Sequence, residues 1–136
     1  MKDRTLQEYS LWEVMDFTRL TSEVIKPFLS GANPVSYGHF DWGINGIKFT
    51  KEMKHHGVII IEGVGLFRPE LNQYFGYKVW VDCPVDEAVR RGKKRDQVEY
   101  QNPQNESWDG IWKKNDAEYF ETYTPKEVAD LVFNNS

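Results

Sequence analysis

Cysteine and long apolar runs are both scarce in this sequence. Its 136 residues include a single cysteine, Cys83, so no disulfide can form within the chain, as is usual in a reducing compartment. The longest uninterrupted apolar run, Val58 to Ile61, is far too short to cross a bilayer, and no apolar stretch follows the first residues. We therefore expect a cytoplasmic protein with no membrane partner.

Positive charge is also in short supply. The chain carries 17 Lys and Arg against 21 Asp and Glu, a formal net charge of -4, which argues against nucleic acid as a partner. The one basic cluster is short and comprises Arg90, Arg91, Lys93, Lys94 and Arg95. An apolar content of 40% is enough for one core, so we expect a single domain over residues 1–136.

The first half of the chain has one clear periodic segment. Apolar residues recur at helical spacing between Phe17 and Phe28, which predicts an amphipathic helix capped by Asp16. Residues 31–46 have no period and are interpreted as a long loop. Residues 51–56 are interpreted as a short helix.

The second half alternates strand and helix patterns. Strands are predicted at residues 58–63, 77–83 and 129–134. A helix should follow Pro84, residues 97–107 are polar and interpreted as mobile, and a second helix should run from Trp108 towards Pro125. This alternation predicts an α/β fold with a parallel sheet and flanking helices, in which ligands bind beyond the carboxyl ends of the strands.

Glu62 and the basic cluster are the first candidates for chemistry. A carboxylate at the carboxyl end of a buried strand can hold Mg²⁺ against nucleotide phosphates, although the same Glu62-Gly63 pair could simply end a strand in a turn. Guanidinium groups on a movable segment, about residues 90–107, can close over a phosphoryl group as a lid. The alternative is a solvated basic helix end.

The segment Tyr37 to Trp42 is the candidate for binding a small molecule. It combines a phenol, an imidazole, a carboxylate and two further rings, which suits stacking on a base and hydrogen bonding to a sugar. Rings in loops also pin the loop to a core, and this alternative stays open.

Four stretches of the sequence occur in a specific order. They are Trp12 to Gly31, Ser36 to Trp42, Val58 to Gly63 followed by Leu66 to Pro69 and Val79 to Pro84, and Arg91 to Asp96 with the final helix and strand. In this order they resemble bacterial uridine-kinase-like proteins of the P-loop kinase superfamily. The match covers nearly the whole chain and is more specific than any one motif.

The resemblance implies transfer of the γ-phosphoryl group of ATP to the 5′-hydroxyl of a nucleoside, with Mg²⁺ bridging the phosphates. It implies catalytic roles for three residues, of which the first is also the metal-side acid: Glu62, Arg91 and Arg95. It places three residues at the nucleoside: Tyr37, His39 and Asp41. It places three at the nucleotide, the last near adenine: Arg91, Arg95 and Asp130.

The sequence departs from that family in one respect. It has no Gly-x-x-x-x-Gly-Lys-Ser/Thr loop, since the lysine in residues 43–50 does not follow a glycine, and the family's proton-accepting aspartate region is also missing. The expected fold is therefore a P-loop-kinase-like sheet without the Walker A strand and loop, as in an N-terminally truncated kinase. In the family that strand lies between those ending at Glu62 and Cys83.

Three explanations stay open. The sequence is a fragment of an active kinase, or the two strands pair directly or are completed by a second copy or another partner, or the chain is a non-catalytic nucleotide-binding, nucleoside-binding or interaction remnant.

Overall fold

The computed structural model describes residues 9–136. It divides into two compact units, which we name the helix–hairpin unit, Met15–Gly63, and the parallel-sheet unit, residues 9–14 with 64–136. The first contains α1 (Phe17–Arg19), η2 (Leu20–Ile25), α2 (Lys26–Leu29), β1 (Val35–Asp41) and β2 (Gly46–Met53). The second contains α3 (Pro69–Asn72), β3 (Val79–Asp82), α4 (Val85–Val98), α5 (Asn105–Asp109), α6 (Ile111–Tyr123), α7 (Pro125–Val128) and β4 (Leu131–Asn134).

The helix–hairpin unit begins with the predicted helix. α1, η2 and α2 follow one another without a break over residues 17–29, with a π-helical segment in the middle. Asp16 caps the start by accepting a hydrogen bond from the backbone N–H of Arg19 at 3.0 Å. Gly31, at φ 88°, follows the end, where the left-handed region favours glycine. The predicted helix is confirmed.

The segment after this helix is a β-hairpin, and the predictions of a loop at 31–46 and a helix at 51–56 were wrong. β1 and β2 pair antiparallel from Val35↔Met53 to Asp41↔Gly46, with a register shift after His39. Asn45 adopts φ 50° just before Gly46. Asn-Gly is a strong hairpin signal because the turn needs residues that tolerate positive φ, and in this sequence the glycines and rings around it obscured the signal.

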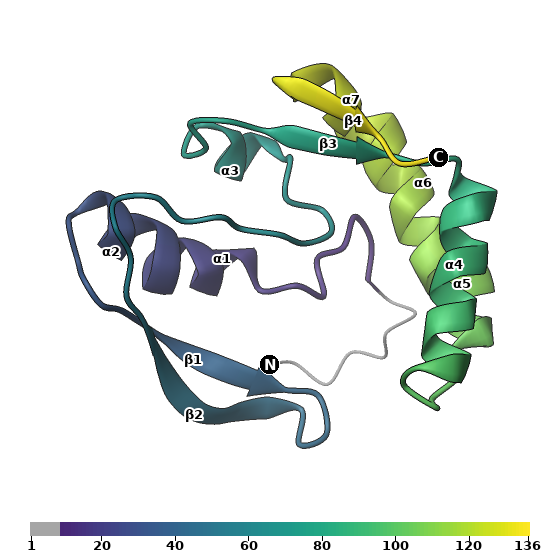
Figure 1. The fold of residues 1–136 in the computed structure, drawn as a ribbon, viewed down its shortest axis with the longest axis horizontal. Coiled ribbons are helices and arrows are strands. Elements are labelled where there is room, and N and C mark those ends of the chain that lie inside the picture. The colour runs from purple at the N-terminus through teal and green to yellow at the C-terminus, as the bar shows by residue number, and fades with distance from the viewer. Residues whose placement is uncertain (1–8) are drawn as a thin grey trace. The chain divides into compact units, whose positions relative to one another are not determined.

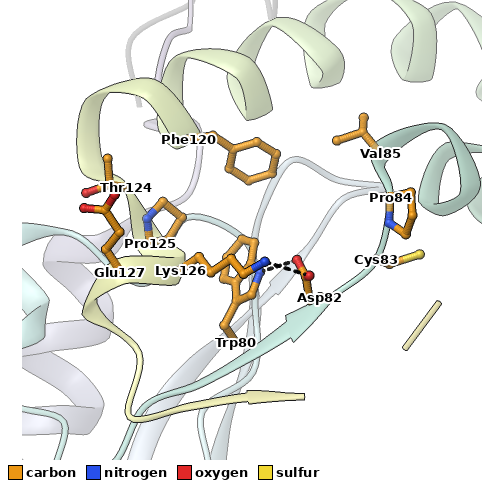
Figure 2. A pocket seen from close by; sticks show the side chains of 10 residues that line it. All are labelled: Trp80, Asp82, Cys83, Pro84, Val85, Phe120, Thr124, Pro125, Lys126 and Glu127. Carbon is orange, nitrogen blue, oxygen red and sulfur yellow. Dashed lines mark hydrogen bonds and ion pairs between the residues drawn. The ribbon is translucent and has the colours of Figure 1, made fainter. Parts of the chain in front are cut away.

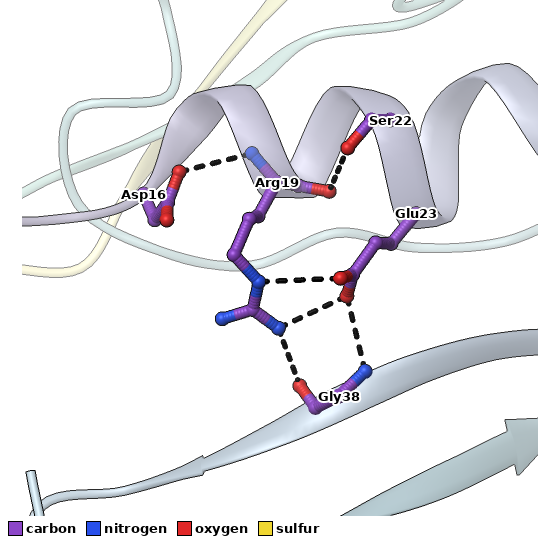
Figure 3. Close-up of polar contacts among 5 residues, drawn as sticks. All are labelled: Asp16, Arg19, Ser22, Glu23 and Gly38. Carbon is purple, nitrogen blue, oxygen red and sulfur yellow. Dashed lines mark hydrogen bonds and ion pairs between the residues drawn. The ribbon is translucent and has the colours of Figure 1, made fainter. Parts of the chain in front are cut away.

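Side chains of the helix bond to the edge of the hairpin (Figure 3). Arg19 Nη2 donates to Glu23 Oε2 and to the carbonyl oxygen of Gly38, both at 2.9 Å, and the Gly38 N–H donates to Glu23 Oε2 at 3.0 Å. The two side chains thus satisfy both backbone groups of an edge-strand residue, as a neighbouring strand would. They fix the helix against β1.

The predicted strand at residues 58–63 is not formed. These residues have neither helix nor strand structure, and Val58 and Ile60 are 77% and 92% exposed. A β-strand exists only where a second strand satisfies its backbone groups, and no described segment pairs with this one. The prediction of a buried strand from the apolar pattern was wrong, because a strand also requires a neighbouring strand.

The parallel-sheet unit confirms the other two predicted strands and the parallel arrangement. β3 and β4 pair in parallel from Val79↔Leu131 to Asp82↔Asn134, and α4 to α7 connect them (Figure 1). Trp80 on β3 meets Phe120 of α6 edge-to-face, with ring centroids 5.7 Å apart. The structure is thus a mixed α/β fold with small sheets, one of them parallel, and flanking helices.

The helix predicted from Trp108 to Pro125 is interrupted. α5 and α6 are separated at Gly110, and Thr124 ends α6 in the left-handed region, with α7 beginning at Pro125. α4 extends to Val98, so the predicted mobile segment contributes only residues 99–104 outside the helices.

α6 organises the core of this unit. Tyr119 is 3% exposed and accepts a hydrogen bond from the backbone N–H of Phe67 at 2.8 Å. Asn115, 2% exposed, accepts from the N–H of Trp12 at 2.7 Å, so residues 9–14 are held on α6. None of the helices in residues 9–136 has the length and apolar character required to cross a bilayer.

Candidate functional sites

Tyr37, His39 and Asp41 occupy alternate positions of β1, so they share one face of the hairpin. The pairing explains this, because the register shift inserts the extra residue, Lys48, into β2 and leaves the alternation of β1 intact. The sequence grouped these residues correctly but assigned them to a loop. On a strand their spacing is fixed, which suits a binding surface better than a loop does.

Asp41 lies at the turn end of this face. Its Oδ2 is 3.1 Å from Lys48 Nζ, and its Oδ1 accepts from the Gly43 N–H at 2.7 Å. The hydrogen bond from Lys48, and then that from Gly43, hold the pKa of Asp41 below its usual range. The carboxylate is therefore ionised at neutral pH and can accept hydrogen bonds from sugar hydroxyls.

Aromatic and cationic groups continue along the same face. The His39 ring stacks on Phe49 of β2, with centroids 4.8 Å apart and an interplanar angle of 18°. Lys51 Nζ lies 5.6 Å from the centre of the Phe49 ring. Phe49 is 46% exposed. A partly exposed ring pair beside an ionised carboxylate is a surface on which a planar base and its sugar can be bound.

Glu62 lies outside any helix or strand, with its side chain exposed. Among the described residues no group of three or more His, Cys, Asp or Glu side chains could hold a metal ion. One carboxylate satisfies only part of the shell of Mg²⁺, which needs six oxygen ligands. A metal-binding role for Glu62 stays a prediction.

Arg91 and Arg95 are four residues apart on α4, so they project from one side of this helix. Both are exposed. Arg91 donates to Glu87 Oε1 at 2.7 Å and to the carbonyl oxygen of Asn135, after β4, at 2.6 Å. The link from Arg91 to the end of β4 could not be read from the sequence, because the two residues lie 44 positions apart.

Arg90 shares the partner of Arg91. It binds Glu87 through two hydrogen bonds of 2.7 and 2.8 Å, and the two arginines lower the pKa of Glu87 to about 2. Glu87 therefore keeps its charge at any physiological pH and offsets part of the positive charge of α4.

A network behind Arg95 was not predicted. Asp96, 5% exposed, accepts from Arg95 through one carboxylate oxygen and from the Trp108 indole N–H, at 2.7 Å, through the other. The Trp108 ring lies directly over Gly92, where a β-carbon would be 2.2 Å from the nearest ring atom. Lys93 and Asp109 add an ion pair of 2.6 Å. The sequence signal was a glycine within a helix that faces a tryptophan of the next helix.

Asp130 has a structural position in this fold. It accepts from the backbone N–H of Lys78 at 2.7 Å, and its Oδ2 is 3.8 Å from Lys78 Nζ. These contacts join the beginnings of β3 and β4, because Lys78 and Asp130 directly precede the first paired residues of those strands. A role of Asp130 near adenine stays a prediction.

A cavity of about 640 Å³ lies beside β3 and is shown in Figure 2. Its lining combines two rings, an ion pair and the free thiol, and comprises Trp80, Asp82, Cys83, Pro84, Val85, Phe120, Thr124, Pro125, Lys126 and Glu127. Lys126 Nζ is 2.9 Å from Asp82 Oδ2, and the Trp80 indole donates to Asp82 Oδ1 at 3.1 Å. The polar groups of Asp82 are thus engaged within the cavity wall.

Comparison with known proteins places this chain among solved structures with a similar fold. No protein-family model and no curated protein matches the chain. A solved structure described as a possible uridine kinase from Bacillus stearothermophilus matches with a TM-score of 0.57 and 25% sequence identity. The fold is kinase-like. The alignment covers 87% of this chain and 54% of the solved structure, so the chain spans about half the length of its neighbour.

Proposed function

We propose that this chain provides the part of an ATP-dependent nucleoside kinase that binds the nucleoside and covers the phosphates of ATP. The observation that carries the proposal is the similarity to the possible uridine kinase, which extends over 87% of the chain. The sequence resemblance to uridine-kinase-like proteins supports the same class. Phosphoryl transfer depends mainly on positioning and on neutralising charge, and both are tasks for the groups described above.

In this proposal the hairpin binds the nucleoside. The ring pair His39 and Phe49 supports the base, while Tyr37 and the ionised Asp41 bind hydroxyl groups of the sugar. Arg91 and Arg95 bind the phosphates of ATP, since they are exposed guanidinium groups on one side of a helix. The phosphate-binding loop that an active kinase needs is not encoded in these 136 residues, so turnover requires that element from elsewhere.

Magnesium accompanies ATP in such reactions, where it bridges and neutralises phosphate oxygens. The described residues do not form a metal site by themselves, and Glu62 offers a single carboxylate. The phosphates of bound ATP would have to supply most of the remaining ligands. We therefore assign no catalytic step to the metal.

The proposal is tested by calorimetric titration of the full chain with Mg-ATP. The wild-type chain should bind weakly and lose affinity as salt is added, because exposed cations carry the interaction. Replacing Arg91 and Arg95 together by alanine should abolish most of this binding. The matched control is Arg90→Ala, which removes one cation of the same helix that lies on a different side.

Two results would count against the proposal. If the wild-type chain does not bind Mg-ATP, the chain is a non-catalytic remnant or a module with another ligand. If Arg90→Ala weakens binding as much as the replacement of both Arg91 and Arg95, the effect reflects the net charge of α4 and not a defined site.

A further inference from the structure

Asp96 is a buried carboxylate whose two oxygens accept hydrogen bonds from residues of two different helices, α4 and α5. Oδ1 accepts from Arg95 Nε at 3.2 Å and from Arg95 Nη2 at 3.1 Å. Oδ2 accepts from the indole N–H of Trp108 on α5 at 2.7 Å. The Asp96 side chain is 7% exposed, whereas that of Arg95 is 48% exposed. The carboxylate thus lies behind the guanidinium, and the guanidinium faces solvent.

Arg95 is held from a second direction as well. The centre of its guanidinium lies 5.3 Å from the centre of the Tyr100 ring, in the segment between α4 and α5. Of the five N–H donors of an arginine, two are directed at Asp96, which leaves three for another acceptor. A free arginine loses rotamer freedom when it binds, whereas one held in place beforehand loses less.

We infer that Asp96 is a positioning residue, which fixes the guanidinium of Arg95 so that its remaining donors bind a polyphosphate. The inference rests on the proposed function, because the phosphates of ATP are the anion concerned. Trp108 helps to hold Asp96 in place. Its indole orients the carboxylate, and its ring packs on Gly92, so α5 holds Asp96 against α4. Arg91, whose partners are Glu87 and Asn135, is held independently.

An effect of charge and an effect of positioning predict opposite changes in anion affinity when Asp96 is replaced. Replacing it by asparagine removes a negative charge next to Arg95, which by electrostatics alone strengthens the binding of an anion. It also places an amide N–H₂ where an oxygen now accepts from Arg95 or Trp108, so one of the two contacts is lost. Weaker binding by a more positive protein is the signature of a positioning role.

The experiment titrates inorganic tripolyphosphate into the full chain and into three variants. Asp96→Asn should bind about tenfold more weakly than wild type, which corresponds to the loss of one charge-assisted contact. Asp109→Asn is the matched control, because it also removes one negative charge and one ion pair, with Lys93, from the α4–α5 contact. It should bind as tightly as wild type or slightly more tightly.

Trp108→Phe is the second test variant. It retains an aromatic ring but removes the indole N–H that bonds to Asp96, together with the outer ring atoms that pack on Gly92. It leaves the contacts between Asp96 and Arg95 in place, so it should weaken binding by a smaller factor, about threefold. This variant decides the question if Asp96→Asn does not fold, as judged by circular dichroism. In that case, wild-type affinity in Trp108→Phe overturns the inference.

An NMR measurement of the Arg95 Nε–H signal gives a readout that does not depend on ligand. The proton should exchange slowly with water in wild type and quickly in Asp96→Asn. Wild-type or tighter binding by Asp96→Asn would overturn the inference, while the proposed function would stand if the Arg91 and Arg95 double replacement still abolishes binding. No effect of that double replacement would overturn both.

Discussion

Replacing Gly92 by alanine tests the packing of α4 against α5. A β-carbon at Gly92 would lie 2.2, 2.4 and 2.9 Å from three atoms of the Trp108 ring, all closer than side chains approach one another. The ring would have to move by about 1 Å or more, which strains its 2.7 Å hydrogen bond to Asp96.

Two opposing terms set the size of the effect. Forcing an additional carbon into a filled contact costs about 1–3 kcal/mol. Alanine is better than glycine within a helix by about 0.5–1 kcal/mol, which offsets part of that cost. We therefore expect Gly92→Ala to lower the free energy of unfolding by about 1–2 kcal/mol, measured by urea denaturation with far-UV circular dichroism.

The same substitution should have the opposite effect on stability in a protein that lacks the Trp108 ring. In Trp108→Ala the ring is absent, so Gly92→Ala should raise the free energy of unfolding by about 0.5–1 kcal/mol through helix propensity alone. If Gly92→Ala stabilises the protein that retains Trp108, the Trp108 ring does not pack closely on α4.

Three further changes test other contacts, each by urea denaturation. Tyr119→Phe should lower the free energy of unfolding by about 1–2 kcal/mol because the partly buried Phe67 N–H loses its acceptor. Burial raises the pKa of Tyr119 to about 12, so the contribution of this side chain is complete below pH 10 and is lost as the pH rises towards 12. Thr124→Gly should stabilise by up to about 1 kcal/mol, because a β-branched residue is strained at φ 41°; a loss of stability would contradict this geometry. Glu23→Gln should cost less than about 1 kcal/mol, since the Glu23 side chain is partly exposed. The hydrogen bond from Arg19 lowers the pKa of Glu23, so the stabilisation by Glu23 is present above pH 4.5 and is lost as the pH drops through the lower pKa of the folded state. A destabilisation by Glu23→Gln that grows in acid would contradict this contact.

The parts of the fold that were predicted correctly are those whose pattern is local. The helix from Phe17, the strand before Pro84, the helix that follows and the last strand all form within a residue or two of their expected positions. In each case periodicity, a cap or a proline marks the boundary, and these signals act over a few residues.

The errors arose where structure depends on a partner. Residues 58–63 have the composition of a buried strand, yet Ile60 is 92% exposed because no described strand pairs with this segment. The hairpin was missed because its only strong signal, Asn45-Gly46, lies among other glycines and aromatic residues.

The candidate site was predictable in its residue types and not in its geometry. The basic cluster that contains Arg91 and Arg95 could be singled out as a candidate from composition and order alone, and its phosphate-binding role stays a prediction. Their partners could not, since the Trp108 bond to Asp96 spans 12 positions and the Arg91 bond to Asn135 spans 44. Contacts at such separations depend on how helices and strands pack, which a local pattern does not encode.

The measurement that tests the central claim most directly is a titration of the full, isotope-labelled chain with uridine, followed by two-dimensional NMR. If the hairpin binds the nucleoside, the amide signals of Tyr37, His39 and Asp41 should shift together and saturably, and Asp41→Asn should weaken the effect. Unshifted hairpin signals, or shifts confined to the cavity beside Trp80, would contradict the account.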